Sequence, residues 1–125
     1  MQTTQKPRLL IVDDSRETVV GLRCFFSPRF HVLEAYNGDD GMRLLEAVDR
    51  PVDLVISDLI MPGASGVWFI TMIKARFPGI PVIAITGWAA DPEQLAGLTK
   101  ADLILFKPFE LEILEGHVLR LLEHR

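Results

Sequence analysis

The chain has 125 residues, of which 49% are hydrophobic and 24% charged, and its formal net charge is −4. This length fits one domain, residues 1–125, and the hydrophobic content favours a packed core over disorder. The acidic balance gives no electrostatic reason to bind nucleic acid, and no apolar run approaches the ~18 residues that a membrane-spanning helix needs. The polar first seven residues differ from a secretory signal, and a single cysteine suits a reducing cytosol. We therefore expect a cytoplasmic protein without direct nucleic-acid or membrane contact.

Short apolar segments alternate with longer amphipathic ones along the chain. The apolar segments predict strands over residues 8–12, 31–35, 53–57, 82–86 and 103–106. The amphipathic segments predict helices over residues 15–27, 39–48, 66–77, 91–99 and 110–123. Strands that lack apolar–polar alternation and are separated by helices indicate a parallel sheet covered on both faces. The sequence therefore predicts an α/β fold.

The predicted helices carry cap and surface signals. Ser15 or Asp14 is a suitable N-cap for the first helix. Cys24 lies in an apolar stretch of that helix, so we expect a small buried hydrophobe rather than a nucleophile. Trp68 and Met72 are four residues apart in the third helix and lie off its apolar stripe. They predict either an exposed contact surface or scattered surface hydrophobes. The stripe itself is Val67, Ile70, Ile73 and Phe77.

Polar side chains stand at the ends of four predicted strands. Asp13 and Asp14 follow the first, Asp58 follows the third, Thr86 ends the fourth and Lys107 follows the fifth. Ligands of open parallel sheets bind outside the carboxyl ends of the strands, so we expect these groups to converge. Neighbouring carboxylates repel each other unless a cation compensates them, and Mg²⁺ prefers oxygen ligands and keeps phosphate oxygens in its shell. The sequence therefore predicts a site for a divalent metal and a phosphoryl group.

The same segments resemble the receiver domain of two-component response regulators. The matching motifs are LLIVDD at residues 9–14, DLVISDLIMPG at 53–63, IAITG at 83–87 and FKPF at 106–109. Residues 33–41, LEAYNGDDG, resemble the family between its second strand and second helix. The resemblance covers about residues 8–122. It implies a doubly wound, flavodoxin-like parallel sheet of five strands in the order 2-1-3-4-5, with five helices.

The resemblance assigns roles to the acidic residues. Asp58 corresponds to the phosphoacceptor of the family. Asp13 and Asp14 correspond to the acidic pair that holds Mg²⁺ directly or through water. Asp58 and the backbone carbonyl of Ile60 correspond to further metal ligands. The implied cofactor is therefore Mg²⁺.

The resemblance also assigns roles at the ends of the fourth and fifth strands. Lys107 corresponds to the lysine that pairs with the phosphoryl group, and Thr86 to the hydroxyl that hydrogen-bonds it. Gly87 leaves the approach to Thr86 open, because a side chain there would crowd the phosphate. Pro108 corresponds to a proline that follows a cis peptide bond, which would direct Lys107 into the site.

One position departs from the family pattern, and two others bear on the lifetime of the phosphoryl group. Ile104 stands where receivers usually carry Tyr or Phe, whose ring swings inward as the Thr moves toward the phosphate. The element that reports phosphorylation is then altered, weakened or moved. Ile60 and Trp88 occupy two positions that tend to set the lifetime of the phosphoryl group, and both are apolar. We expect them to hinder the attacking water and to slow self-dephosphorylation.

The implied function is a signalling switch, not an enzyme beyond self-phosphorylation and self-dephosphorylation. A sensor histidine kinase or histidine phosphotransfer protein would donate the phosphoryl group to Asp58. The modified domain would change its affinity for an output protein or a fused output domain, and a homodimer is a further option. One alternative is a degenerate receiver that acts as a phosphorylation-independent interaction module, which Ile104 favours. Another is a phosphatase or flavin protein on the same sheet, which the adjacent Asp13 and Asp14 disfavour.

Overall fold

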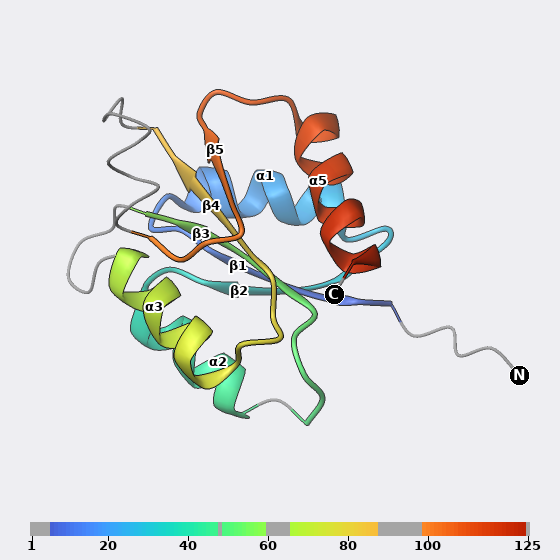
Figure 1. The fold of residues 1–125 in the computed structure, drawn as a ribbon. Helices are drawn as coiled ribbons and strands as arrows, with labels where there is room; N and C mark the ends of the chain where they lie inside the picture. The colour runs from blue at the N-terminus through green and yellow to red at the C-terminus, as the bar shows by residue number, and fades with distance from the viewer. Residues whose placement is uncertain (1–5, 48, 60–65, 88–98, 125) are drawn as a thin grey trace, which may run out of the picture.

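The computed structural model describes residues 6–47, 49–59, 66–87 and 99–124. Five strands form one parallel sheet in the order β2-β1-β3-β4-β5, as expected (Figure 1). The strands are β1 (Arg8–Val12), β2 (His31–Ala35), β3 (Leu54–Asp58), β4 (Val82–Thr86) and β5 (Leu103–Phe106). The helices are α1 (Arg16–Phe26), α2 (Gly38–Ala47), α3 (Gly66–Arg76) and α5 (Leu111–Glu123). The helix predicted over residues 91–99 lies, apart from Thr99, outside the described residues.

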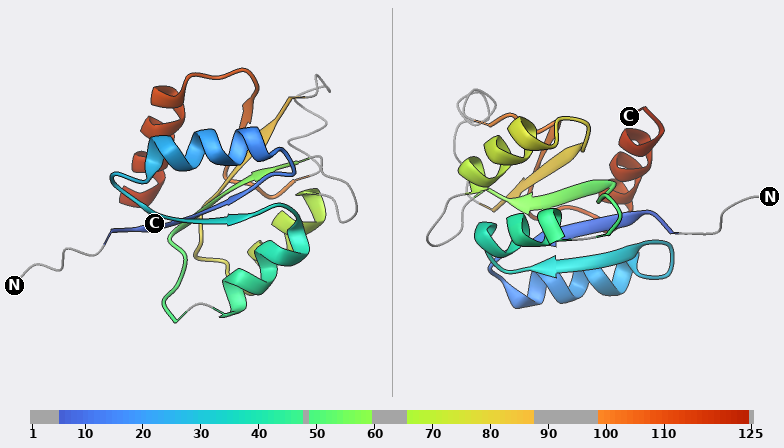
Figure 2. Two further views of the ribbon diagram at one scale, coloured as in Figure 1. Left: turned by 180° about the vertical axis from the view of Figure 1, so that it is seen from behind. Right: turned by 90° about the horizontal axis from the view of Figure 1, so that it is seen from below.

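Helices cover both faces of the sheet, which explains why the strands lack alternation. Helices α1 and α5 lie over one face, and α2 and α3 lie over the other (Figure 2). The α2/α3 cluster includes Leu10, Val12, Phe69, Ile70, Ile73 and Ala84. The α1/α5 cluster includes Leu9, Ile11, Val19, Leu22, Leu114 and Val118. Successive strand residues thus enter opposite clusters, and both sets must be apolar.

The first residues of β1 and β4 each donate a backbone hydrogen bond to the side chain of an aspartate that directly precedes the neighbouring strand. The backbone N–H of Arg8 donates to Asp53 Oδ2 at 2.7 Å. The backbone N–H of Val82 donates to Asp102 Oδ2 at 2.7 Å, and Asp102 also pairs with Lys74. Strand β3 begins at Leu54 and ends at Asp58, one residue later at each end than predicted. These bonds anchor the strands at the edge opposite their carboxyl ends.

Helix α1 has the predicted N-cap, but its buried face does not include Cys24. Ser15 is the N-cap, and its hydroxyl accepts a hydrogen bond from the backbone N–H of Thr18. The buried residues are Val19, Leu22 and Phe26. Cys24 is exposed, so the prediction of a buried residue there is wrong. It lies two residues beyond Leu22, about 200° around the helix axis.

Helix α3 packs closely on α2 through an aromatic ring. Phe69 is fully buried, and a Cβ atom added at Gly41 would lie 2.7 Å from its Cζ atom. The glycine therefore lets the two helices approach. Trp68 is 42% exposed, whereas Met72 is partly buried against the α2/α3 cluster, so only Trp68 matches the predicted exposed pair. Among the described residues, no helix has the length and apolar character to cross a membrane.

Candidate functional site

Three carboxylates meet at the carboxyl ends of β1 and β3. Asp13 follows β1 and is fully buried, and Asp58 ends β3 and is 6% exposed. Asp14 is exposed beside them. One carboxylate oxygen from each of the three residues lies within 4.8 Å of the others. The convergence predicted from the strand ends is therefore present in the fold.

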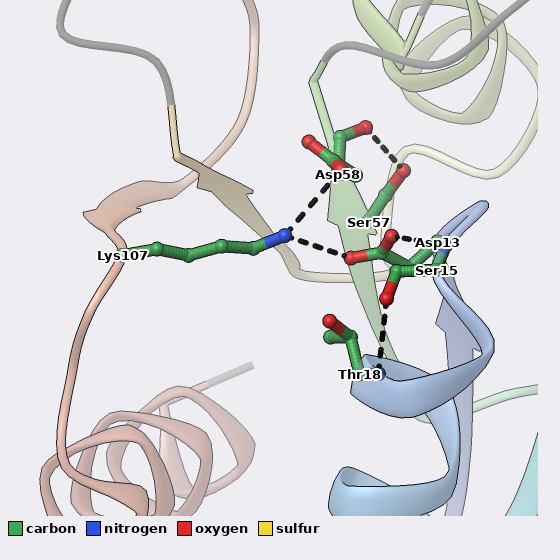
Figure 3. A network of polar contacts seen from close by, with 6 residues as sticks. All are labelled: Asp13, Ser15, Thr18, Ser57, Asp58 and Lys107. Atoms are coloured by element: carbon green, nitrogen blue, oxygen red, sulfur yellow. Dashed lines mark hydrogen bonds and ion pairs between the residues drawn. The ribbon is translucent and has the colours of Figure 1, made fainter.

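Lys107 reaches the carboxylates from the end of β5. Its Nζ atom lies 3.1 Å from Asp13 Oδ2 and 3.5 Å from Asp58 Oδ2. Figure 3 shows its extended side chain ending between the two aspartates. The backbone N–H of Lys107 donates to the carbonyl of Thr86 at 2.8 Å, and the Lys107–Pro108 peptide bond is cis, as expected. The fifth strand thus places an ammonium group over an acidic cluster built by the first and third.

The buried charge at Asp13 is only partly compensated. Burial is the largest effect and raises the pKa of Asp13 above 3.8, and the charge of Asp58 adds to it. The backbone N–H of Ser15, which donates to Asp13 Oδ1 at 2.9 Å, and the Lys107 ammonium oppose the rise. Partial burial acts to lower the pKa of Lys107, but its contacts with Asp13 and Asp58 outweigh it and raise the pKa above 10.5. Lys107 therefore stays charged at neutral pH.

The donor set suits a hard divalent cation. Asp13, Asp14 and Asp58 supply only oxygen atoms, and the Lys107 ammonium lies beside Asp13 and Asp58. When all four groups are ionised, two formal negative charges remain. Burial and the charge of Asp58 raise the pKa of Asp13, so a cation bound beside it would favour its ionised form. The residues present therefore fit a metal ion of the Mg²⁺ type.

The remaining predicted residues differ in burial, and two of them lie outside the described residues. Thr86 ends β4 and is fully buried. Gly87 is exposed, and a Cβ atom there would lie 3.5 Å from Lys107 Cδ, an ordinary contact, so its role in keeping the site open stays a prediction. Ile104 is partly buried against the α2/α3 cluster. Ile60 and Trp88 lie outside the described residues.

Sequence reasoning missed a glycine that borders the site. The backbone N–H of Gly66, at the start of α3, donates to the carbonyl of Leu59 at 3.0 Å. A Cβ atom at Gly66 would overlap the carbonyl oxygen of Asp58 and would lie 2.6 Å from Leu59 Cα. The helix therefore begins directly against the backbone of Asp58. A glycine at the first position of a predicted helix was the available signal.

Comparison with known proteins gives an independent result. The family model described as a response regulator receiver domain matches residues 9–119. The chain is 32% identical over 121 residues to the transcriptional regulatory protein PrrA of Mycobacterium tuberculosis, which is 95% of this chain and 51% of PrrA. It is 31% identical over 118 residues to the sensor kinase CckA of Brucella abortus, which is 92% of this chain and 12% of CckA. The chain thus spans about half or less of these relatives.

Solved structures give the same picture of the fold. The signal receiver domain of an HD domain-containing protein from Pseudomonas fluorescens has a TM-score of 0.87 and 26% identity, covering 99% of this chain and 92% of that chain. A response regulator receiver domain protein from Clostridium thermocellum has a TM-score of 0.85 and 26% identity. That match covers 94% of this chain and 95% of the other. The likeness therefore extends over nearly the whole of each chain.

Proposed function

The chain belongs to the family of response regulator receiver domains, and on that premise we propose that it is a phosphoacceptor switch with Asp58 as the acceptor. The observation that carries the proposal is the Lys107 ammonium, 3.5 Å from Asp58 Oδ2 and beside the acidic cluster. Positioning and charge neutralisation perform nearly all the catalysis of phosphoryl transfer. An aspartate with an adjacent fixed cation and a metal-binding set has the parts for that reaction.

Mg²⁺ is the proposed cofactor. Asp13, Asp14 and Asp58 would hold it through carboxylate oxygens, and the carbonyl of Ile60, outside the described residues, is a proposed further ligand. When bound, Mg²⁺ supplies positive charge that neutralises the oxygens of the phosphoryl group. The under-compensated charge of Asp13 supports this assignment, since a cation there relieves it.

The transfer itself uses groups of this chain. A carboxylate oxygen of Asp58 attacks the phosphorus of a phosphohistidine, in line with the phosphorus–nitrogen bond. That bond breaks, and its electron pair stays on the imidazole nitrogen of the donor. Lys107 then pairs with a phosphoryl oxygen, which its present position beside Asp58 allows. Thr86, buried at the end of β4, is the proposed hydrogen-bond donor to another phosphoryl oxygen.

The partners follow from this chemistry. The phosphoryl donor would be a sensor histidine kinase or a histidine phosphotransfer protein. The phosphorylated domain would act on an output protein or a fused output domain. Among the relatives, PrrA is a transcriptional regulatory protein and CckA a sensor kinase, each longer than this chain. Self-association is a further proposal.

Apolar Ile60 and Trp88 are proposed to slow hydrolysis of phospho-Asp58. A Trp88→Glu variant whose phospho-Asp58 has an equal or longer lifetime than that of wild type would contradict this.

Intact mass measured after incubation with acetyl phosphate tests the function. Wild type should gain one phosphoryl group when Mg²⁺ is present and none when a chelator removes it. Asp58→Asn should gain none, whereas Asp39→Asn, an exposed aspartate in the first turn of α2, should behave as wild type. If wild type gains no adduct from acetyl phosphate or from a phosphohistidine donor, the domain is instead a phosphorylation-independent interaction module.

A further inference from the structure

Ser57 is a polar residue at an apolar position of β3, and it is fully buried. Val55, two residues earlier on the same strand, belongs to the α2/α3 cluster. Val12 and Ala84, which pair with Ser57 in β1 and β4, belong to it as well. Ser57 therefore faces that cluster. A buried hydroxyl is unfavourable unless it forms a hydrogen bond, so the partner of this hydroxyl indicates its role.

The hydroxyl of Ser57 is bonded to the backbone of the proposed phosphoacceptor. Its Oγ atom donates to the carbonyl oxygen of Asp58 at 3.0 Å, a contact that Figure 3 shows near the end of β3. Asp58 itself pairs with Ile85, which belongs to the α1/α5 cluster on the opposite face of the sheet. Adjacent residues of a strand project from opposite faces, so Ser57 acts on Asp58 through the backbone.

Three contacts hold the peptide unit that joins Asp58 to Leu59. The Ser57 hydroxyl bonds its carbonyl group, and its N–H group, that of Leu59, donates to the carbonyl of Ile85 in β4 at 2.9 Å. The backbone of Gly66 lies against the same carbonyl, since a Cβ atom at Gly66 would overlap the Asp58 oxygen. Because a peptide unit is planar, its orientation sets the ψ angle of Asp58. That angle helps to determine the direction in which the Asp58 side chain leaves the strand.

We propose that Ser57 is a positioning residue for phosphoryl transfer: its hydroxyl holds the peptide unit after Asp58, so that the Asp58 carboxylate keeps its place beside Lys107. This inference rests on the proposed function of Asp58. Asp58 Oδ2 lies 3.5 Å from Lys107 Nζ, and the transfer rate depends on how well the attacking oxygen is aligned with the phosphorus. Ser57 does not touch the reacting atoms, so its hydroxyl affects the alignment of Asp58 and not the binding of the phosphodonor.

Initial rates of adduct formation, measured by intact mass over a range of acetyl phosphate concentrations with Mg²⁺, test this inference. In that reaction a carboxylate oxygen of Asp58 attacks the phosphorus, the phosphorus–oxygen bond to the acetyl group breaks, and acetate leaves with the electron pair. Ser57→Ala removes only the hydroxyl and should lower the maximum rate about tenfold, since the carboxylate loses part of its alignment. The acetyl phosphate concentration at half the maximum rate should stay unchanged, because Lys107 and the acidic cluster are still present.

Two variants separate positioning from a general loosening of the core. Val55→Ala removes buried apolar atoms from the same face of β3, so its free energy of unfolding should fall in urea while its maximum rate stays that of wild type. Ser57→Thr keeps a hydroxyl on the same Cβ atom and should restore most of the rate that Ser57→Ala loses. The inference is overturned if Ser57→Ala reaches the wild-type maximum rate, or if Val55→Ala is slowed as much as Ser57→Ala.

The same mass spectra distinguish the two possible failures. An adduct that forms on wild type and on Ser57→Ala at equal maximum rates overturns the role of Ser57 and leaves the function of Asp58 standing. Absence of any adduct on wild type, from acetyl phosphate or from a phosphohistidine donor, overturns the proposed function, and the role of Ser57 falls with it.

Discussion

Replacing Gly66 by alanine perturbs the site without touching any ionisable group. The added Cβ atom would overlap the carbonyl oxygen of Asp58 and would lie 2.6 Å from Leu59 Cα and 2.7 Å from Leu59 C. Ordinary van der Waals contact begins at 3.4 Å. The contact with Leu59 Cα alone requires a movement of roughly 0.8 Å, and the overlap with the Asp58 carbonyl requires more, so the backbone after Asp58 must recede or α3 must move away. All three obstructing groups are backbone atoms, which cannot turn aside as a flexible side chain can.

Two effects of opposite sign determine the stability of Gly66→Ala. Alanine in a helix is favoured over glycine by about 0.5–1 kcal/mol. Overpacking of a filled site typically costs about 1–3 kcal/mol. Because backbone must move, we expect the clash to dominate and the free energy of unfolding to fall. Gly116→Ala is the matched control: a Cβ atom there has nothing within 4 Å, so the same substitution in α5 should raise the free energy of unfolding by about 0.5–1 kcal/mol.

Urea unfolding and phosphorylation kinetics are the assays. A displacement of about 1 Å can cost about 10²-fold in rate when reacting groups must be aligned, so Gly66→Ala should take up phosphoryl groups from acetyl phosphate about 10²-fold more slowly. Gly116→Ala should keep the wild-type rate. If both variants shift the free energy of unfolding in the same direction, or if Gly66→Ala is phosphorylated at the wild-type rate, the close approach of α3 to Asp58 is refuted.

Three further predictions concern the charges of the site. Mg²⁺ at 100 times its dissociation constant should raise the free energy of unfolding by about 2.7 kcal/mol in wild type, and by much less in Asp13→Asn; equal gains would remove Asp13 from the ligand set. Because burial chiefly raises the pKa of Asp13 above 3.8, its protonated form stabilises the fold below that pH, and this contribution is lost as pH rises through the raised pKa. In chelator, the free energy of unfolding of wild type relative to Asp13→Asn should therefore fall with rising pH in urea titrations, and a constant difference would contradict the assignment. Lys107→Met should slow adduct formation by about 10²-fold, measured by intact mass, whereas Lys100→Met, which removes an exposed lysine, should not.

The strand ends carried most of the information that the sequence offered. In a parallel sheet covered on both faces, strands must be continuously apolar, so a polar residue that interrupts the pattern marks a strand end. That rule placed Asp13 and Lys107 at one edge although 94 residues separate them, and their side chains are 3.1 Å apart. The strand bounds followed for the same reason, except that β3 runs over Leu54–Asp58 instead of the predicted 53–57.

Helix rotation and close backbone contacts were harder to predict. Cys24 lies in an apolar run, but the direction in which α1 turns its apolar face depends on the sheet beneath it, and Cys24 points away. The need for Gly66 arises from the backbone of Asp58 and Leu59, which no side-chain pattern encodes. Sequence patterns report which residues prefer burial, whereas these two features depend on how elements distant in sequence approach each other.

The packing of the sheet indicates where a signal can leave the site. All five residues of β3 and all five of β4 are buried, so Asp58 and Thr86 stand on strands whose movement would disturb both core clusters. Strand β5 is packed less tightly, with three partly buried residues and an exposed Phe106. At the start of β4, the Asp102 side chain accepts a hydrogen bond from the Val82 N–H, and at its end the Thr86 carbonyl accepts one from the Lys107 N–H. These two bonds keep the register between β4 and β5, while the side chains of β5 remain adjustable. A site that stands on buried strands and borders a loosely packed edge can change its surface without unfolding its core, and β5, which leads directly to Lys107, is such an edge.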